Sequence, residues 1–263
     1  MLTGDKELVR LARLPSWEYD GHSANAALLF HGDDLAAFKA LQKSDPKLAK
    51  LQRHVGKITS HGAQRGMRGA RQSDNILKEL GIYVSPEKCD SNLSIYHRRY
   101  PAIQASYFRD IRRQVMRDRL LVNSWGRVWD LKWDRIDDEL YRAAYSFLPQ
   151  SEVADLLNQW GLVPTYYYLK SLTGRPPNIQ VHDSMLTSVA PQDAYDVAVF
   201  IAKSLERPRL YAGNQLVIPV EFKLGLNWGA DEKAGEGFEF KRLPSRAEFE
   251  EKAMWLDGRR VSG

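Results

Sequence analysis

The stretch NIQVHDSMLTSV, residues 178–189, places short apolar runs on both sides of a polar pair. It predicts two short strands folded back on each other, with His182 and Asp183 at the bend. Prolines bound this unit on both sides. A carboxylate at the tip of a rigid hairpin keeps its position while its neighbours are buried, which suits a metal ligand. A plain turn, in which Asp simply favours the bend, is the alternative interpretation.

The composition of the chain is typical of a soluble globular protein. Its 263 residues, 43% hydrophobic and 27% charged, can form one large domain or two smaller ones. We expect no membrane partner, because no apolar run could cross a bilayer and the N-terminus lacks a secretory signal. The lone Cys89 excludes an internal disulfide framework and a cysteine-rich zinc site, which favours a reducing, cytoplasmic location.

The net charge of +5 is modest, but basic residues are concentrated between residues 97 and 135. The basic side chains there are interleaved with aromatic ones: Arg98, Arg99, Arg109, Arg112, Arg113, Arg117, Arg119, Arg127 and Lys132, with Tyr96, Tyr100, Tyr107, Phe108, Trp125, Trp129 and Trp133. Arginines bind phosphates and aromatic rings stack on bases, so this segment indicates a nucleic-acid partner. A solvated helix face above ordinary core aromatics is the alternative.

Apolar spacing and breaker residues predict a mixture of helices and strands. We expect helices at 23–41, 47–62, 73–80, from Ser85 onward, from Pro101 through 117, at 137–147, at 151–160 after a break at 148–150, and at 192–206. We expect strands within 8–19 and 215–224, and a hairpin at 120–134. The polar tail 229–263 is expected to be partly ordered at best. This mixed order, without a βαβ rhythm, predicts an α+β fold around a mainly antiparallel sheet.

Basic residues recur every four positions in the second expected helix and just beyond it, at Arg53, Lys57, His61 and Arg65. This spacing places them on one slowly turning helix face. Such a row repels itself by a few tenths of a kcal/mol per pair, which an anion such as a triphosphate would relieve. A solvated basic stripe is the alternative interpretation.

The same segment carries a family resemblance. Residues 53–67 read RHVGKITSHGAQRGM, which resembles the Arg-x-x-x-Lys-x-x-x-aromatic-x-x-x-Tyr-Gly fingers helix of family A DNA polymerases, in their phage-type branch. Further blocks follow in the family's order: SDNIL at 73–77, YPAI at 100–103, WGR at 125–127, RAAYSFLPQS at 142–151, VHDS at 181–184 and IPVE at 218–221. Each block alone is a weak signal, but the ordered set is a strong one.

The resemblance implies a polymerase palm with an inserted helical fingers subdomain. The palm would comprise residues 1–45, with the first carboxylate motif, and 111–229, with the hairpin; residues 46–110 would form the fingers and 230–263 a tail. We expect the family's thumb and exonuclease to be absent, as in one subunit of a split polymerase, with a second polypeptide supplying the thumb. The implied partners are a DNA primer–template and deoxynucleoside triphosphates, in a bacterial cytoplasm if the chain is phage-encoded.

Two sets of binding positions follow from the resemblance. The nucleotide-binding set is Arg53, Lys57, His61, Arg65 and Ser23. Within it, Arg53 and Lys57 would bind the phosphates and His61 would pack against the incoming nucleotide. The primer- and template-binding set is Arg142, Ser146, Gln150 and His182.

The resemblance also implies two Mg²⁺ ions, or Mn²⁺, held by converging carboxylates. Asp183 matches the second catalytic carboxylate of the palm, and the first would lie in the stretch Glu18, Tyr19, Asp20. The register favours Glu18 as the catalytic ligand, with Asp20 as the alternative. Both acids could also be ordinary turn residues.

Several residues depart from the family pattern. Ser23 replaces a Glu associated with excluding ribose, Asn25 replaces an Arg, Arg65 replaces a Tyr and Ser184 replaces a Glu. The ordered set of blocks makes template-directed DNA synthesis the leading hypothesis. Because Ser23 replaces the Glu, we expect weak discrimination against ribonucleotides. A polymerase-like nucleic-acid-binding protein without catalysis is the second hypothesis, and a relative of single-subunit RNA polymerases is the third.

Overall fold

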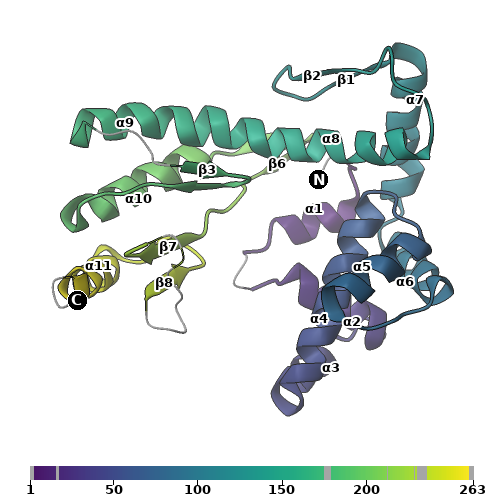
Figure 1. Cartoon of the computed structure of the whole chain (residues 1–263), viewed down its shortest axis with the longest axis horizontal. Coiled ribbons are helices and arrows are strands. Elements are labelled where there is room, and N and C mark those ends of the chain that lie inside the picture. Colours follow the sequence, from purple (N-terminus) through teal and green to yellow (C-terminus); the bar gives the residue numbers. More distant parts are fainter. Residues whose placement is uncertain are drawn as a thin grey trace. The chain divides into compact units, whose positions relative to one another are not determined.

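The computed structural model describes residues 3–15, 18–174, 179–211, 213–227, 229 and 236–260. The chain divides into two compact units: Met1–Gln150 with Tyr211–Asn214, and Ser151–Leu210 with Gln215–Gly263. Helices dominate, and the strands form short pairs (Figure 1). Among the described residues, no helix is both long and apolar enough to span a membrane.

The first unit begins with helix α1 (Lys6–Ala12), where the sequence predicted a strand. That prediction was wrong because Asp5 caps the helix, its Oδ1 accepting from the backbone N–H groups of Glu7 and Leu8 at 3.1 Å. The single helix predicted for 23–41 is also two helices, α2 (Gly21–Phe30) and α3 (Leu35–Ser44). Gly32 and Asp33 separate them with φ angles of 62° and 71°, which no α-helix accommodates.

Three further helices confirm the predictions from capping residues. They are α4 (Pro46–Gln64), α5 (Gly69–Leu80) and α6 (Pro86–Arg99). Asp45 and Ser85 accept the N-cap hydrogen bonds of α4 and α6, and Gly81 ends α5 with a φ of 69°.

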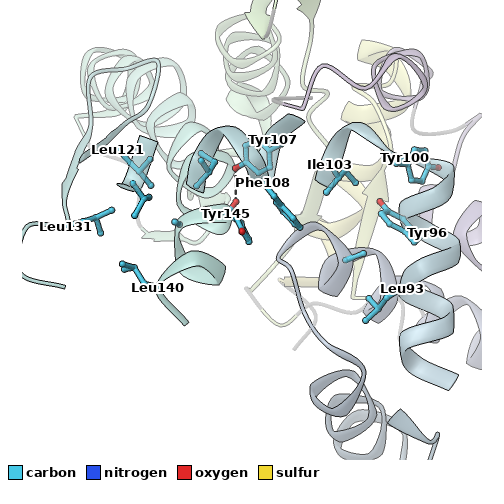
Figure 2. Close-up of a cluster of buried hydrophobic side chains, with 14 of the residues drawn as sticks. Leu93, Tyr96, Tyr100, Ile103, Tyr107, Phe108, Leu121, Leu131, Leu140 and Tyr145 are labelled. Atoms are coloured by element: carbon cyan, nitrogen blue, oxygen red, sulfur yellow. Dashed lines mark hydrogen bonds between the residues drawn. The ribbon is translucent and has the colours of Figure 1, made fainter. Parts of the chain in front are cut away.

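The predicted long helix and hairpin that follow are also confirmed. The helix consists of a π-helical segment η1 (Ile103–Phe108) and α7 (Arg109–Asp118). The hairpin pairs β1 (Leu120–Val122) with β2 (Val128–Asp130), with Leu121 opposite Trp129. Side chains from α6, η1, α7 and the hairpin bury one another in the main core of the unit (Figure 2).

The predicted break at 148–150 does not occur. Helix α8 (Asp138–Leu156) runs through Pro149 and continues through η2 (Leu157–Leu162) into α9 (Val163–Thr173) (Figure 1). Pro149 has no N–H to donate to the Tyr145 carbonyl one turn earlier. The Tyr107 hydroxyl donates to that carbonyl instead, at 2.8 Å, so the buried oxygen keeps a partner (Figure 2).

The second unit contains the predicted hairpin, β3 (Ile179–Val181) with β4 (Ser184–Leu186), and the predicted helix α10 (Pro191–Leu205). The other strands are β5 (Arg209–Tyr211), β6 (Asn214–Leu216) and β7 (Phe222–Gly225). The continuous strand predicted for 215–224 was therefore wrong. Its middle contains Pro219, which cannot donate to a strand ladder.

The tail was expected to be partly ordered at best, and residues 236–260 of it are folded. They form β8 (Gly237–Phe240), which pairs with β7, and α11 (Arg246–Arg260). Phe240 and Phe249 are buried with Ala194 and Ala198 of α10. The described strands form four separate two-stranded sheets, rather than one main sheet, and β1–β2, β3–β4 and β7–β8 are antiparallel. The assigned palm, fingers and tail boundaries stay predictions.

Candidate active site

The basic row lies along the exposed face of α4. Lys57 and His61 are exposed, Arg53 leaves 42% of its side chain exposed, and Arg65 is exposed at the C-cap. Val55 and Ile58 are buried on the opposite face. The structure therefore gives the row the solvent access that an anionic ligand requires.

Helix α2 packs closely on α4 because residue 56 is a glycine. A Cβ atom at Gly56 would lie 2.8 Å from the backbone nitrogen of Ala26 and 3.1 Å from the carbonyl oxygen of His22. Only a residue without a side chain permits this approach. The approach brings the first turn of α2 beside Arg53.

Asp20 connects the two helices. Its Oδ2 accepts from Arg53 Nε at 2.7 Å and its Oδ1 from Arg53 Nη2 at 3.0 Å. The same carboxylate caps α2 through the His22 N–H at 3.0 Å and accepts from Ser23 Oγ at 2.7 Å. Desolvation opposes ionisation of Asp20, but the hydrogen bonds from Arg53 and Ser23 outweigh it and lower its pKa to about 2.

His22 was not among the predicted site residues. Its ring centroid lies 5.6 Å from that of His61, and its Nδ1 is buried without a described hydrogen-bond partner. Desolvation lowers the pKa of His22, and the cation of Arg53 lowers it further. Desolvation, followed by the charges of His22 and Arg65, also lowers the pKa of His61. The sequence signal that could have identified His22 is Asp20, a favourable N-cap residue, which places His22 in the first turn of a helix.

Glu18 and Tyr19 differ in their surroundings. Glu18 is exposed, and its carboxylate makes no hydrogen bond or ion pair with any described residue. The half-buried Tyr19 side chain packs against the main core, where desolvation raises its pKa. Only the backbone of Tyr19 is therefore available to a metal site, whereas no described residue occupies the Glu18 carboxylate.

Asp183 lies at the tip of the β3–β4 hairpin in the second unit. Val181 pairs with Ser184, which leaves His182 and Asp183 as the two turn residues, with a φ of 52° at His182. Both turn residues are exposed, and the Asp183 carboxylate has no hydrogen-bond or ion-pair partner within the described part of the chain. The flanking residues 175–178 lie outside the described residues.

The predicted primer- and template-binding residues of α8 lie in one row. Arg142, Ser146 and Gln150 are four residues apart, and Ser146 Oγ donates to the Arg142 carbonyl at 3.1 Å. Arg142 and Ser146 are half-buried and Gln150 is exposed.

The structure thus brings Asp20, Ser23 and Arg53 into direct contact in the first unit. His182 and Asp183 share the hairpin of the second unit. Across the described ranges, no three His, Cys, Asp or Glu side chains gather into a metal-binding group.

Comparison with solved structures shows which known fold this chain resembles. The structure is similar to that described as the POL domain of Pol1 from M. smegmatis in complex with DNA primer-template and dNTP, with a TM-score of 0.59, 19% sequence identity and coverage of 78% of this chain. The chain has a DNA polymerase-like fold. It spans 33% of the chain that it matches. No protein-family model and no curated protein matches the sequence.

Proposed function

We propose that the chain catalyses template-directed DNA synthesis, transferring a deoxynucleotide to a primer 3′-hydroxyl. The observation that carries the proposal is the exposed basic face of α4 within a fold similar to that of a DNA polymerase domain. In the reaction the primer oxygen forms a bond to the α-phosphorus of the nucleotide, the bond to pyrophosphate breaks, and the hydroxyl proton leaves. The primer–template and dNTP named for the similar structure are the partners that we propose here.

The residues of α4 would bind and orient the triphosphate. Lys57 is an exposed cation without a described ion pair and can donate directly to phosphate oxygens. Arg53 is held by Asp20, so a phosphate must replace that carboxylate or share the guanidinium with it. Ser23 is buried and donates to Asp20, so it offers no long side chain against a ribose 2′-hydroxyl. We therefore expect ribonucleotides to be incorporated with little discrimination.

The two exposed carboxylates fit the donor chemistry of divalent metal ions. Glu18 and Asp183 offer hard oxygen ligands that no described residue occupies, as Mg²⁺ and Mn²⁺ require. Asp20 fits less well, because Arg53, Ser23 and the His22 N–H already occupy both of its oxygens. When bound, two such ions would lower the pKa of the primer hydroxyl and neutralise charge on the leaving pyrophosphate.

Primer extension with deoxynucleotides and Mg²⁺ tests the proposal. We expect extension by the wild type and none by Asp183→Asn, which removes a charge without changing the hairpin. Glu251→Gln is the matched control, because Glu251 is an exposed carboxylate of the same unit without a described ion pair. Unchanged extension by Asp183→Asn would refute the assignment. Ribonucleotides in the same assay test the expectation from Ser23. The second polypeptide expected to carry a thumb stays a prediction.

A nucleic-acid-binding protein without catalysis is the second candidate function. It is favoured by the carboxylate that already neutralises Arg53 and by the absence of a three-residue metal group among the described residues. Titration calorimetry with Mn²⁺ distinguishes the two functions. Binding that is lost in both Glu18→Gln and Asp183→Asn would contradict this candidate.

A further inference from the structure

One face of α7 is almost entirely cationic. Its exposed residues follow helical spacing: Arg109, Arg112, Arg113, Met116 and Arg117. Ile111 and Val115 are buried on the opposite face. The two outer arginines pair with their neighbours Asp110 and Asp118 at 2.9 and 2.7 Å. Arg112 and Arg113 make no ion pair with any described residue, so their charges are available to a ligand.

A hollow of about 390 Å³ opens at the start of this helix, lined by Gln104, Phe108, Arg109, Arg112 and Tyr145. The rings of Phe108 and Tyr145 stack with centroids 3.9 Å apart (Figure 2). The Arg112 guanidinium lies 4.8 Å from the centroid of the Tyr141 ring and donates to the Tyr145 hydroxyl. Its orientation is therefore fixed by neutral partners. The charge of Asp138 also acts on Arg112, but that carboxylate forms its ion pair with Arg68.

A second aromatic surface follows the β1–β2 hairpin. Trp133 is 97% exposed in a turn closed by the Asp134 N–H donating to the Leu131 carbonyl at 3.2 Å. Arg119, at the end of α7, holds this turn by donating to the Asp134 carbonyl at 2.9 Å. The flanking Lys132 and Arg135 are exposed without a described ion pair. A fully exposed indole on a fixed turn can stack on an unpaired base.

We propose that α7 and the turn of Trp133 bind single-stranded nucleic acid, separately from the basic row of α4. Arg112 and Arg113 bind phosphates, and the exposed Trp133 ring stacks on a base. Phe108 and Tyr145 are buried and only line the hollow. The ten residues of α7 extend for about 15 Å, long enough to contact several phosphates of one strand. The partner is single-stranded because stacking on the exposed indole of Trp133 requires a base freed from pairing. Only the identification of this strand as the unpaired template depends on the proposed function.

Fluorescence anisotropy with a labelled dT12 oligonucleotide, without metal or nucleotide, tests the inference on the full chain. Arg112→Gln/Arg113→Gln should weaken binding at least tenfold and lower the slope of log affinity against log salt by about 1.4, at roughly 0.7 per phosphate contact. Lys47→Gln/Lys50→Gln is the matched control, since it removes the same charge from exposed positions on α4. Arg113→Gln alone should weaken binding without altering the Arg112 contacts to the tyrosines.

Stacking is tested by Trp133→Ala, which should weaken binding roughly fivefold or more. Tyr83→Ala is the control, because Tyr83 is 69% exposed outside the proposed surface and its loss should leave binding unchanged. Wild-type affinity in the arginine variants, or an equal loss in the lysine control, would overturn the proposal. Weakened binding of duplex DNA with unchanged binding of dT12 would overturn it as well. The assay contains neither metal nor nucleotide, so its outcome is independent of the test of catalysis.

Discussion

At the scale of single residues, Asp20 has two separable roles. It caps α2 through the His22 N–H and forms a bidentate ion pair with Arg53. Because asparagine is as good an N-cap as aspartate, Asp20→Asn should keep the cap and lose the charge. The pair is about two-fifths exposed on both sides, so we expect a loss of only ~0.5–1 kcal/mol in the free energy of unfolding.

Chemical denaturation measures this loss, and Asp34 provides its control. Asp34 caps α3 through the Ala37 N–H at 2.9 Å and forms no ion pair with a described residue. Asp34→Asn should therefore be neutral, whereas Asp34→Ala and Asp20→Ala should each lose about 1 kcal/mol from the missing cap. Equal stability of Asp20→Asn and Asp34→Asn would show that the ion pair contributes nothing.

Three histidines with lowered pKa values predict a pH dependence of stability. Desolvation lowers the pKa of His97, as it does for His22 and His61, below the ordinary value of 6.5. Below pH 6.5 the unfolded chain therefore binds more protons than the folded chain does. The free energy of unfolding consequently falls as the pH decreases. Denaturation at pH 5, 6 and 7 should show stability rising with pH. His97→Gln should make this rise shallower, and an unchanged rise would argue against a desolvated His97.

At the scale of elements, the Tyr107 hydroxyl explains why α8 tolerates Pro149. Tyr107→Phe would leave the buried Tyr145 carbonyl without a donor, at a cost of ~1–3 kcal/mol. In a Pro149→Ala background the N–H of residue 149 can bond to that carbonyl, so the same substitution should cost less. A double-mutant cycle on unfolding free energies measures this coupling. Additive effects would mean that the hydroxyl does not replace the missing helix bond.

Gly56 sets the approach of α2 to α4. Gly56→Ala would place a methyl group 2.8 Å from backbone, so the helices must separate, and we expect a loss of ~1–3 kcal/mol. Gly258→Ala in α11 meets nothing within 4 Å and should be neutral or stabilising by up to ~1 kcal/mol. Urea denaturation of the two variants checks the contrast. Equal effects would show that the close approach at residue 56 can relax.

Capping chemistry made much of the helical structure predictable. Asp45 before Pro46, Ser85 before Pro86 and Gly81 after α5 each fix a boundary through neighbouring residues. The continuity of α8 could not be predicted in this way, because Tyr107 lies 38 positions before Tyr145. The order of residues 236–260 likewise depends on distant packing, since Phe249 is buried against α10 rather than stabilised locally.

The candidate site shows the same limit. The row from Arg53 to Arg65 follows from helical spacing, and the structure confirms its exposed face. The contact between Asp20 and Arg53 spans 33 positions and depends on Gly56, so no local pattern indicated it. The tip position of Asp183 was predictable because a two-residue turn follows from the flanking strands.

At the scale of the whole molecule, two residues with different proposed roles belong to different compact units. Lys57 belongs to the first unit and Asp183 to the second, and their proposed roles differ: one binds triphosphate and the other supports the chemical step. Lys57→Ala should raise the KM for deoxynucleotide about tenfold with a smaller change in kcat, because a charge-assisted hydrogen bond contributes roughly 1.5–3 kcal/mol. Asp183→Asn should instead lower kcat with little change in KM.

Steady-state primer extension at varied nucleotide concentration separates these two effects. Lys203→Ala is the control for the lysine, since Lys203 is exposed on α10 without a described ion pair. If Lys57→Ala lowered kcat alone, Lys57 would act on the chemical step rather than in nucleotide binding. If Asp183→Asn raised KM alone, the hairpin would bind substrate rather than support catalysis, and the assignment of the two units to separate tasks would fail.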